Sequence, residues 1–151
     1  MGVGETCCSG FPTWQHFPAI IGRALLCLLP HRIFTRSFLF WLMEDLSRRD
    51  ETGRQEIEAW VEISYAAPRC FKAKPMVNPT LLSDAEWQGI QVPTLFLVGE
   101  NEKIYSAREA VERLQKVAPR IKTDIIPRAG HDLTIVQAGI VNRKVLEFLG
   151  P

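Results

Sequence analysis

A carboxylate and an imidazole stand in two short segments where acid–base chemistry is feasible. Glu102 lies in GENEK at 99–103, and His131 lies in RAGHD at 128–132. A carboxylate that faces one imidazole nitrogen fixes the tautomer of the ring and stabilises the imidazolium that forms when the other nitrogen takes a proton from a nucleophile. These two side chains are therefore our candidate catalytic residues, with His131 as general base and Glu102 as the residue that orients it.

The two segments follow stretches that have the pattern of buried strands. Residues 93–98 form a continuous apolar run, and residues 121–126 supply a second strand. The order strand, helix, strand, helix demands a parallel pair joined by a right-handed crossover. Adjacent parallel strands end at the same edge of a sheet, about 4.8 Å apart. Glu102 and His131 are thus expected to meet there, although 29 positions separate them in sequence.

Helical periodicity and capping signals predict the elements around these strands. Helical patterns cover 18–29, 32–49 and 52–67, and a final helix covers 133–149. Three segments have the form of a capping box, and each predicts a helix start: 52–55, 83–86 and 106–109. In the helix after residue 106, one face carries Ala110, Val111, Leu114 and Val117. In the final helix, the side chains expected to point inward are Val136, Ile140, Val141, Val145 and Phe148.

The composition fits one globular domain and gives no support to nucleic-acid binding. The chain has 151 residues, of which 46% are hydrophobic and 23% charged, and its formal net charge is +1. Neither sign of charge collects in a block that could follow a phosphate backbone. The apolar segments at 17–30 and 33–43 are interrupted by charged residues, so no transmembrane segment is expected.

The cysteines indicate neither a metal nor a cofactor. They stand at positions 7, 8, 27 and 70, with no CxxC pair and no histidine near enough in sequence to complete a zinc site. Reduced thiols are the simplest interpretation, and they favour a cytoplasmic location.

The first residues carry two further patterns. Residues 1–6 fit the M-G-x-x-x-[ST] pattern of N-myristoylation, and Cys7 and Cys8 would be able to accept palmitate. The same residues also fit an irregular chain start without a secretory signal, which is the interpretation we favour for 1–16. Ser9 is a weak candidate nucleophile, because no strand precedes it to hold a strained turn.

Together these motifs resemble those of the α/β-hydrolase superfamily, in esterase-like or lipase-like members. VPTLFLVGENE at 92–102 and AGHDL at 129–133 are similar to the acid and histidine motifs of that family. The resemblance covers residues 78–149. It implies an α/β protein with the C-terminal half of the α/β-hydrolase fold, in which Glu102 and His131 are the acid and the base of a catalytic triad.

Glu100 is the alternative acid. The family usually has Asp in a G-x-x-D pattern, and Glu102 occupies the matching position with a longer side chain. Glu100 lies directly after the glycine that ends the strand, where a side chain more often packs the loop or forms a salt bridge. The family spacing therefore favours Glu102.

The resemblance also divides the chain into regions. After the irregular segment 1–16, residues 17–78 look like the helical cap or lid of the family, and residues 79–151 look like the C-terminal core portion. Substrate contacts would be sought among the aromatic side chains of the cap, although core packing is the commoner use of such residues: Phe34, Phe38, Phe40, Trp41 and Trp60.

One motif of the family has no counterpart. The nucleophile stands in a G-x-S-x-G elbow, and no such string occurs in the sequence. We therefore expect part of a serine carboxylic-ester hydrolase that lacks nucleophile and oxyanion hole and is inactive alone. In its full-length form it would take a small-molecule ester or acyl substrate, and a complementary N-terminal half is an expected partner. The alternative is a non-catalytic binding or partner-complementing module of the same fold, because two strands leave an apolar edge to be covered.

Overall fold

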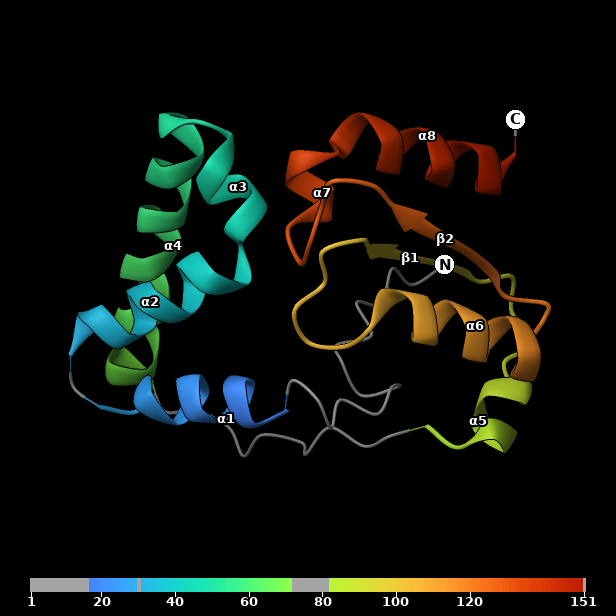
Figure 1. Ribbon diagram of the computed structural model, residues 1–151, viewed down its shortest axis with the longest axis horizontal. Helices are drawn as coiled ribbons and strands as arrows, with labels where there is room; N and C mark the ends of the chain where they lie inside the picture. Colours follow the sequence, from blue (N-terminus) through green and yellow to red (C-terminus); the bar gives the residue numbers. More distant parts are fainter. Residues whose placement is uncertain (1–16, 30, 72–81, 151) are drawn as a thin grey trace.

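The computed structural model describes residues 17–29, 31–71 and 82–150, which form a helical part and a part built on a small sheet (Figure 1). The helical part holds α1 (Phe17–Leu26), α2 (Arg32–Leu42), α3 (Glu44–Arg49) and α4 (Glu51–Cys70). The sheet part holds α5 (Asp84–Gln88), β1 (Leu95–Gly99), α6 (Ala107–Val117), β2 (Lys122–Ile126), α7 (Leu133–Val136) and α8 (Ala138–Leu149). The lipidation pattern and Ser9 lie outside the described residues.

The sheet confirms the expected parallel pair. β1 and β2 run parallel, in a register that pairs Leu95 with Lys122 and Gly99 with Ile126. α6 connects the strands and lies along one face of the pair, whereas α8 lies along the other (Figure 1). No helix within the described ranges is long and apolar enough to cross a membrane.

Alternate side chains of the strands enter two different cores. Phe96 and Val98 pack with the buried face of α6, whereas Leu97 and Ile126 pack with Val141 of α8. On α6, the predicted core face is confirmed, with three buried side chains and one half-buried: Ala110, Val111, Leu114 and Val117. The two faces of the sheet are therefore held by separate sets of apolar contacts.

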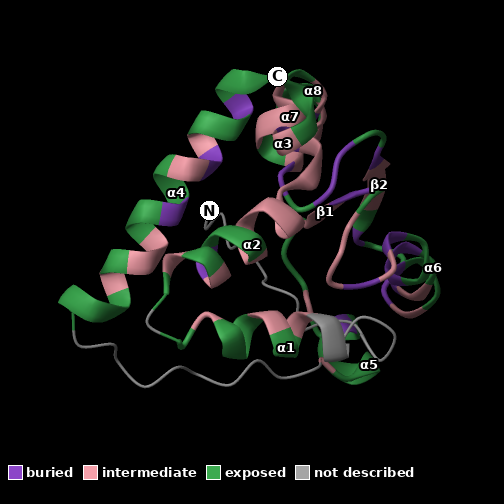
Figure 2. Cartoon of the chain, turned by 60° about the vertical axis from the view of Figure 1, so that its left-hand side comes forward, coloured by how far each residue is buried: buried purple, intermediate pink, exposed green. Residues whose placement is uncertain are grey.

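A third core lies within the helical part. Leu46 of α3 packs there with Ile57 and Val61 of α4, and all three are fully buried. The buried residues of α4 lie on its side toward α2 and α3 (Figure 2). Ile135 and Val136 of α7 pack against this core, and Val136 also packs in the core under α8. α7, which directly follows the loop of His131, thus joins the helical part to the sheet part.

Two helices that the periodicity predicts as continuous are interrupted. The expected helix at 32–49 breaks at Met43, whose φ of −103° and ψ of 46° separate α2 from α3. The expected helix at 133–149 breaks at Gln137 between α7 and α8. At Gln137 the break lets α7 reach the core of the helical part while α8 covers the sheet. At Met43, residues of α2, Met43 itself and Leu46 of α3 all pack into the core of the helical part.

The predicted helix start at Thr52 is wrong. Asp50 caps α4 instead, because its side chain accepts the backbone N–H of Gly53 at 2.6 Å and the helix begins one residue earlier than expected. The helix also continues beyond residue 67 to Cys70, with Pro68 inside its last turns.

The other two helix starts are confirmed, the first with a full capping box and the second with the serine cap alone. Ser83 and Glu86 form a reciprocal capping box at the start of α5. Ser106 accepts the backbone N–H of Glu109 at 3.3 Å at the start of α6.

The inward face of the final helix is only partly as predicted. Val141 is buried and Ile140 is half-buried, but Val145 is 38% exposed. This portion of α8 contacts β2 through Lys144, which pairs with Asp124, and through half-buried Phe148, whose ring centroid lies 5.5 Å from Lys122 Nζ.

Candidate active site

His131 and Glu102 meet where the two strands end. The acid loop (100–104) leaves β1, and the histidine loop (127–132) leaves β2. His131 Nδ1 lies 3.2 Å from Glu102 Oε2. The side chain of Glu102 is 4% exposed and that of His131 is 36% exposed. The edge of the sheet thus brings together the two residues that the sequence predicts to be neighbours.

Glu102 is held in place by its own loop. Its Oε1 accepts the backbone N–H groups of Lys103 at 2.8 Å and Ile104 at 3.0 Å, so that Oε2 faces His131. Burial raises the pKa of Glu102, but the hydrogen bond and charge of His131 and the two backbone bonds outweigh it, and the net pKa is below the ordinary value. Glu102 is therefore a carboxylate at neutral pH, and it accepts the Nδ1 proton of the ring. In neutral His131 the basic lone pair then lies on Nε2.

Glu100, the alternative acid, has another role in the structure. Its Oε2 accepts the backbone N–H of Arg128 at 3.1 Å. Arg128 has a φ of 52°, in the left-handed region that non-glycine residues seldom adopt. Glu100 thus fixes the turn that leads from β2 into the histidine loop.

The two loops approach so closely that Gly99 has no room for a side chain. The backbone N–H of Glu100 donates to Ile126 and that of Asn101 donates to Ala129, both at 2.9 Å. A Cβ on Gly99 would lie 2.3 Å and 2.4 Å from the carbonyl oxygens of Ala129 and Gly130. A glycine at the end of β1 is therefore required for the loops to touch.

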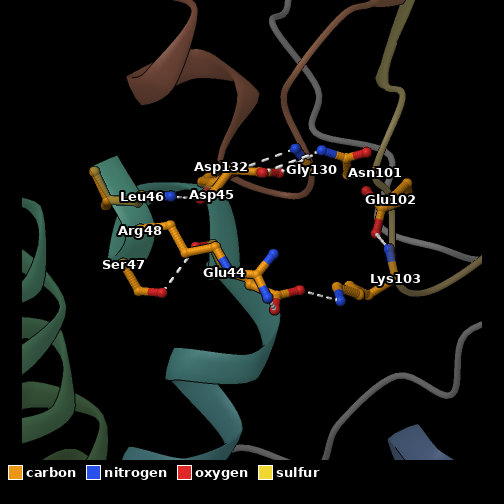
Figure 3. A network of polar contacts seen from close by, with 10 residues as sticks. All are labelled: Glu44, Asp45, Leu46, Ser47, Arg48, Asn101, Glu102, Lys103, Gly130 and Asp132. Carbon is orange, nitrogen blue, oxygen red and sulfur yellow. Dashed lines mark hydrogen bonds and ion pairs between the residues drawn. The ribbon is translucent and has the colours of Figure 1, made fainter. Parts of the chain in front are cut away.

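The first residues of α3 contact both loops (Figure 3). Glu44 forms an ion pair with Lys103, and Asp45 accepts hydrogen bonds from Asn101 Nδ2 at 3.1 Å. The backbone N–H of Leu46 donates to Asp132 Oδ2 at 2.7 Å. Sequence reasoning missed these contacts. It placed Asp132 in the histidine motif without a role, and no local pattern links it to a residue 86 positions away.

A groove of about 550 Å³ lies between α1, α2 and α4. Phe38 lines it, whereas Phe40 packs against the core of the helical part and Trp60 is 52% exposed on α4. Of these three aromatic residues, only Phe38 lines the groove, and Phe40 has the core-packing role that is commoner for such residues. The groove lining is mostly apolar: Ala24, Cys27, Leu28, Thr35, Phe38, Leu39, Ser64, Pro68 and Arg69. In the described part of the chain, no three His, Cys, Asp or Glu side chains lie together in a way that would hold a metal ion.

Comparison with known proteins relates this chain to hydrolases. The chain is 34% identical over 113 residues to carboxylesterase YbfK of Bacillus subtilis, a match that spans 75% of this chain and 38% of that protein. The solved structure of that esterase, CesB (YbfK), superimposes with a TM-score of 0.67 over 87% of this chain at 29% identity. The chain belongs to the α/β-hydrolase superfamily. No model of a known protein family matches it.

Two further solved structures from Bacillus subtilis share this fold. One is a protein assigned as a hydrolase, with a TM-score of 0.73, 26% identity and coverage of 94% of this chain and 48% of that one. The other is naproxen esterase, with a TM-score of 0.70, 25% identity and coverage of 88% and 46%. The chain spans less than half the length of each of these relatives, and its fold is consistent with the C-terminal part of the α/β-hydrolase fold.

Proposed function

We propose that this chain contributes Glu102 and His131 to the catalytic triad of a serine carboxylic-ester hydrolase. The observation that carries the proposal is the 3.2 Å contact between His131 Nδ1 and Glu102 Oε2 at the carboxyl ends of neighbouring parallel strands. The similarity to carboxylesterase YbfK and to naproxen esterase supports carboxylic esters as the substrate class. The nucleophile elbow and the oxyanion hole would come from polypeptide outside this sequence, which contains no G-x-S-x-G string.

The geometry of the pair defines the proton transfers. As the serine hydroxyl attacks the ester carbonyl carbon, His131 Nε2 takes its proton, and the carboxylate of Glu102 stabilises the imidazolium. The tetrahedral intermediate expels the alcohol, which leaves with the proton from Nε2, and an acyl-serine remains. Water then attacks the acyl-serine with the same two proton transfers, which releases the acid and restores the serine. Without the serine, the chain should hydrolyse no ester above background.

The helical part would serve as the cap of this enzyme. We assign residues 17–78 to a cap or lid and residues 79–151 to the catalytic core portion. The apolar groove between α1, α2 and α4 is where an acyl chain would lie, since its lining includes Leu28, Phe38 and Leu39.

The exposed apolar side chains of the sheet part favour association with further polypeptide. On α8, Leu146 is 67% exposed and Leu149 is 53% exposed, and Val92 before β1 is 71% exposed. A sheet of two strands is also seldom stable without further cover. A complementary N-terminal half would bury this surface. The same observation supports the second candidate function, a non-catalytic module that binds a partner chain.

A chimeric enzyme tests the catalytic proposal. The part of carboxylesterase YbfK that matches this chain is replaced by this chain, and hydrolysis of p-nitrophenyl butyrate is measured. We expect an active chimera in which His131→Ala lowers kcat by at least about 10³-fold, as removal of a triad member does in serine hydrolases. Glu102→Ala should lower kcat by about 10²-fold or more, whereas Glu100→Ala, the matched control, should change it only a few-fold. A folded chimera that is inactive, or whose activity survives His131→Ala, contradicts the proposal.

Experiments on the isolated chain test whether it needs another polypeptide to cover its apolar surface. We expect it to bind a hydrophobic dye and to elute from size-exclusion chromatography as more than a monomer, because of the exposed residues on α8. A stable monomer that binds little dye would count against both the complementary half and the partner-binding module.

A further inference from the structure

The start of α3 lacks a capping residue of its own. Met43 occupies the N-cap position and makes no side-chain hydrogen bond there. The first N–H groups of a helix have no partner within the helix, so they need an acceptor from elsewhere. For Leu46 that acceptor is Asp132 Oδ2, at 2.7 Å. The histidine loop therefore caps a helix that lies far from it in sequence.

The same carboxylate also holds the backbone on the other side of His131. Asp132 Oδ1 accepts the N–H of Gly130 at 3.3 Å, and the residue is only 2% exposed. Gly130 in turn packs tightly, since a Cβ there would lie 3.1 Å from the carbonyl oxygen of Asn101 and 3.2 Å from Asp45 Oδ2. One buried side chain thus ties the residues before and after His131 to α3.

The acid loop also contacts α3 through the residues before and after its catalytic candidate. Asn101 precedes Glu102 and bonds to Asp45, and Lys103 follows Glu102 and pairs with Glu44. α3 therefore contacts the neighbours of both members of the pair, as Figure 3 shows for Asp132, Asn101 and Lys103.

The Asp132 contact differs from the other two in burial. The Asn101 side chain lies in solvent and Lys103 is 28% exposed, and water-exposed polar pairs constrain a loop only weakly. The buried carboxylate of Asp132 makes a short, charge-assisted bond to Leu46 at 2.7 Å, and an unsatisfied N–H in its place would be costly. We propose that Asp132 is a positioning residue: by joining the histidine loop to α3, it keeps His131 in contact with Glu102. This inference rests on the proposed function.

The pKa of Glu102 measures that contact in the full chain without any catalytic turnover. It is followed by ¹³C NMR of the Glu102 side-chain carboxyl carbon during a pH titration. His131→Gln provides the reference state without the ring, and its Glu102 pKa should be higher than in the wild type, because the hydrogen bond and charge of His131 lower it.

Asp132→Asn is the test variant. The amide keeps one acceptor oxygen and points an NH₂ group at the second backbone N–H, so one of the two bonds is lost. We expect the pKa of Glu102 to rise by at least half of the change seen in His131→Gln. Burial raises the pKa of Asp132, so its carboxyl is in part protonated where Glu102 titrates; whatever charge it carries there, loss of that charge cannot raise the pKa of Glu102, and an increase reports loss of the His131 contact. Asp84→Asn on α5, whose carboxylate pairs with Arg113, is the matched control and should leave the titration unchanged.

The outcomes separate this inference from the proposed function. A folded Asp132→Asn chain in which Glu102 titrates as in the wild type overturns the positioning role and leaves the pair intact. If His131→Gln leaves the titration of Glu102 unchanged, the pair itself is absent and the proposed function fails with it. Should Asp132→Asn not fold, Asp132→Glu is read in the same way: it keeps the charge but shifts the backbone, and an unchanged Glu102 titration overturns the proposal.

Discussion

Replacement of Gly99 by alanine tests whether the close approach of the two loops is required for the fold. An added Cβ would lie 2.3 Å from the carbonyl oxygen of Ala129, and side chains essentially never come closer than 3.0 Å to such an atom. The histidine loop would have to retreat by about 0.7 Å, a forced overpacking that typically costs about 1–3 kcal/mol. The backbone bonds from Glu100 and Asn101 across the loops would lengthen as well, and each contributes about 1 kcal/mol.

We therefore expect Gly99→Ala to lower the free energy of unfolding by about 2–4 kcal/mol, measured by urea unfolding followed by circular dichroism. Gly139→Ala in α8 is the matched control: nothing lies within 4 Å of its added Cβ, and alanine should stabilise the helix by up to about 1 kcal/mol. The pKa of the Glu102 carboxyl should rise in Gly99→Ala, because the histidine loop retreats and carries His131 away from it. Equal stability of the two alanine variants would refute the reasoning.

Three further predictions follow from local features. Asp50→Ala should destabilise the chain by about 1 kcal/mol in thermal unfolding, whereas Thr52→Ala should be nearly neutral, because Asp50 caps α4. Since the folded-state pKa of Glu102 lies below its ordinary value of 4.5, its charge stabilises the fold above that pH, and this contribution is lost as the pH falls through the folded-state pKa. The stability difference between wild type and Glu102→Gln in urea should therefore narrow in acid. Leu146→Glu, at a 67% exposed position, should reduce binding of a hydrophobic dye while the unfolding free energy changes by less than about 0.5 kcal/mol; unchanged dye binding would contradict the apolar association surface.

The sheet edge could be predicted because its determinants are local and repeated. Each strand is an apolar run, and the strand–helix–strand order permits one handedness of connection. Parallel pairing then brings Glu102 and His131 to one edge without any knowledge of side-chain packing. The N-caps at Ser83 and Ser106 could also be predicted, since a cap acts on backbone groups three residues away in sequence.

The breaks in the helices could not be predicted from the periodicity. Neither Met43 nor Gln137 is a helix breaker, and the apolar pattern continues across both. At Gln137 the successive segments pack against different cores, whereas α2 and α3 on either side of Met43 pack into one core and α3 also contacts α7. Both arrangements are properties of the assembled fold. The cap at Asp50 was missed for a different reason: Thr52 offers a competing signal two residues later, and only the observed contact with Gly53 decides between them.

The contacts of α3 with the two loops were out of reach for the same physical reason. They join residues 56 to 86 positions apart, and their geometry depends on α7 being seated in the core of the helical part. The residue type at position 132 gave partial information, since the carboxylate directly after His131 must either lie in water or accept hydrogen bonds from the protein. The sequence did not show which of these holds.

The bond from Leu46 to Asp132 uses a main-chain amide, which every amino acid except proline provides at position 46. Evolution can therefore vary the side chains of the helical part, including those around the groove, while this link to the histidine loop persists. Under the proposed function, a lineage that changes its acyl preference need conserve only the carboxylate of Asp132 to keep this link. The fold thus allows the side chains around the groove to change while the positions of Glu102 and His131 stay the same.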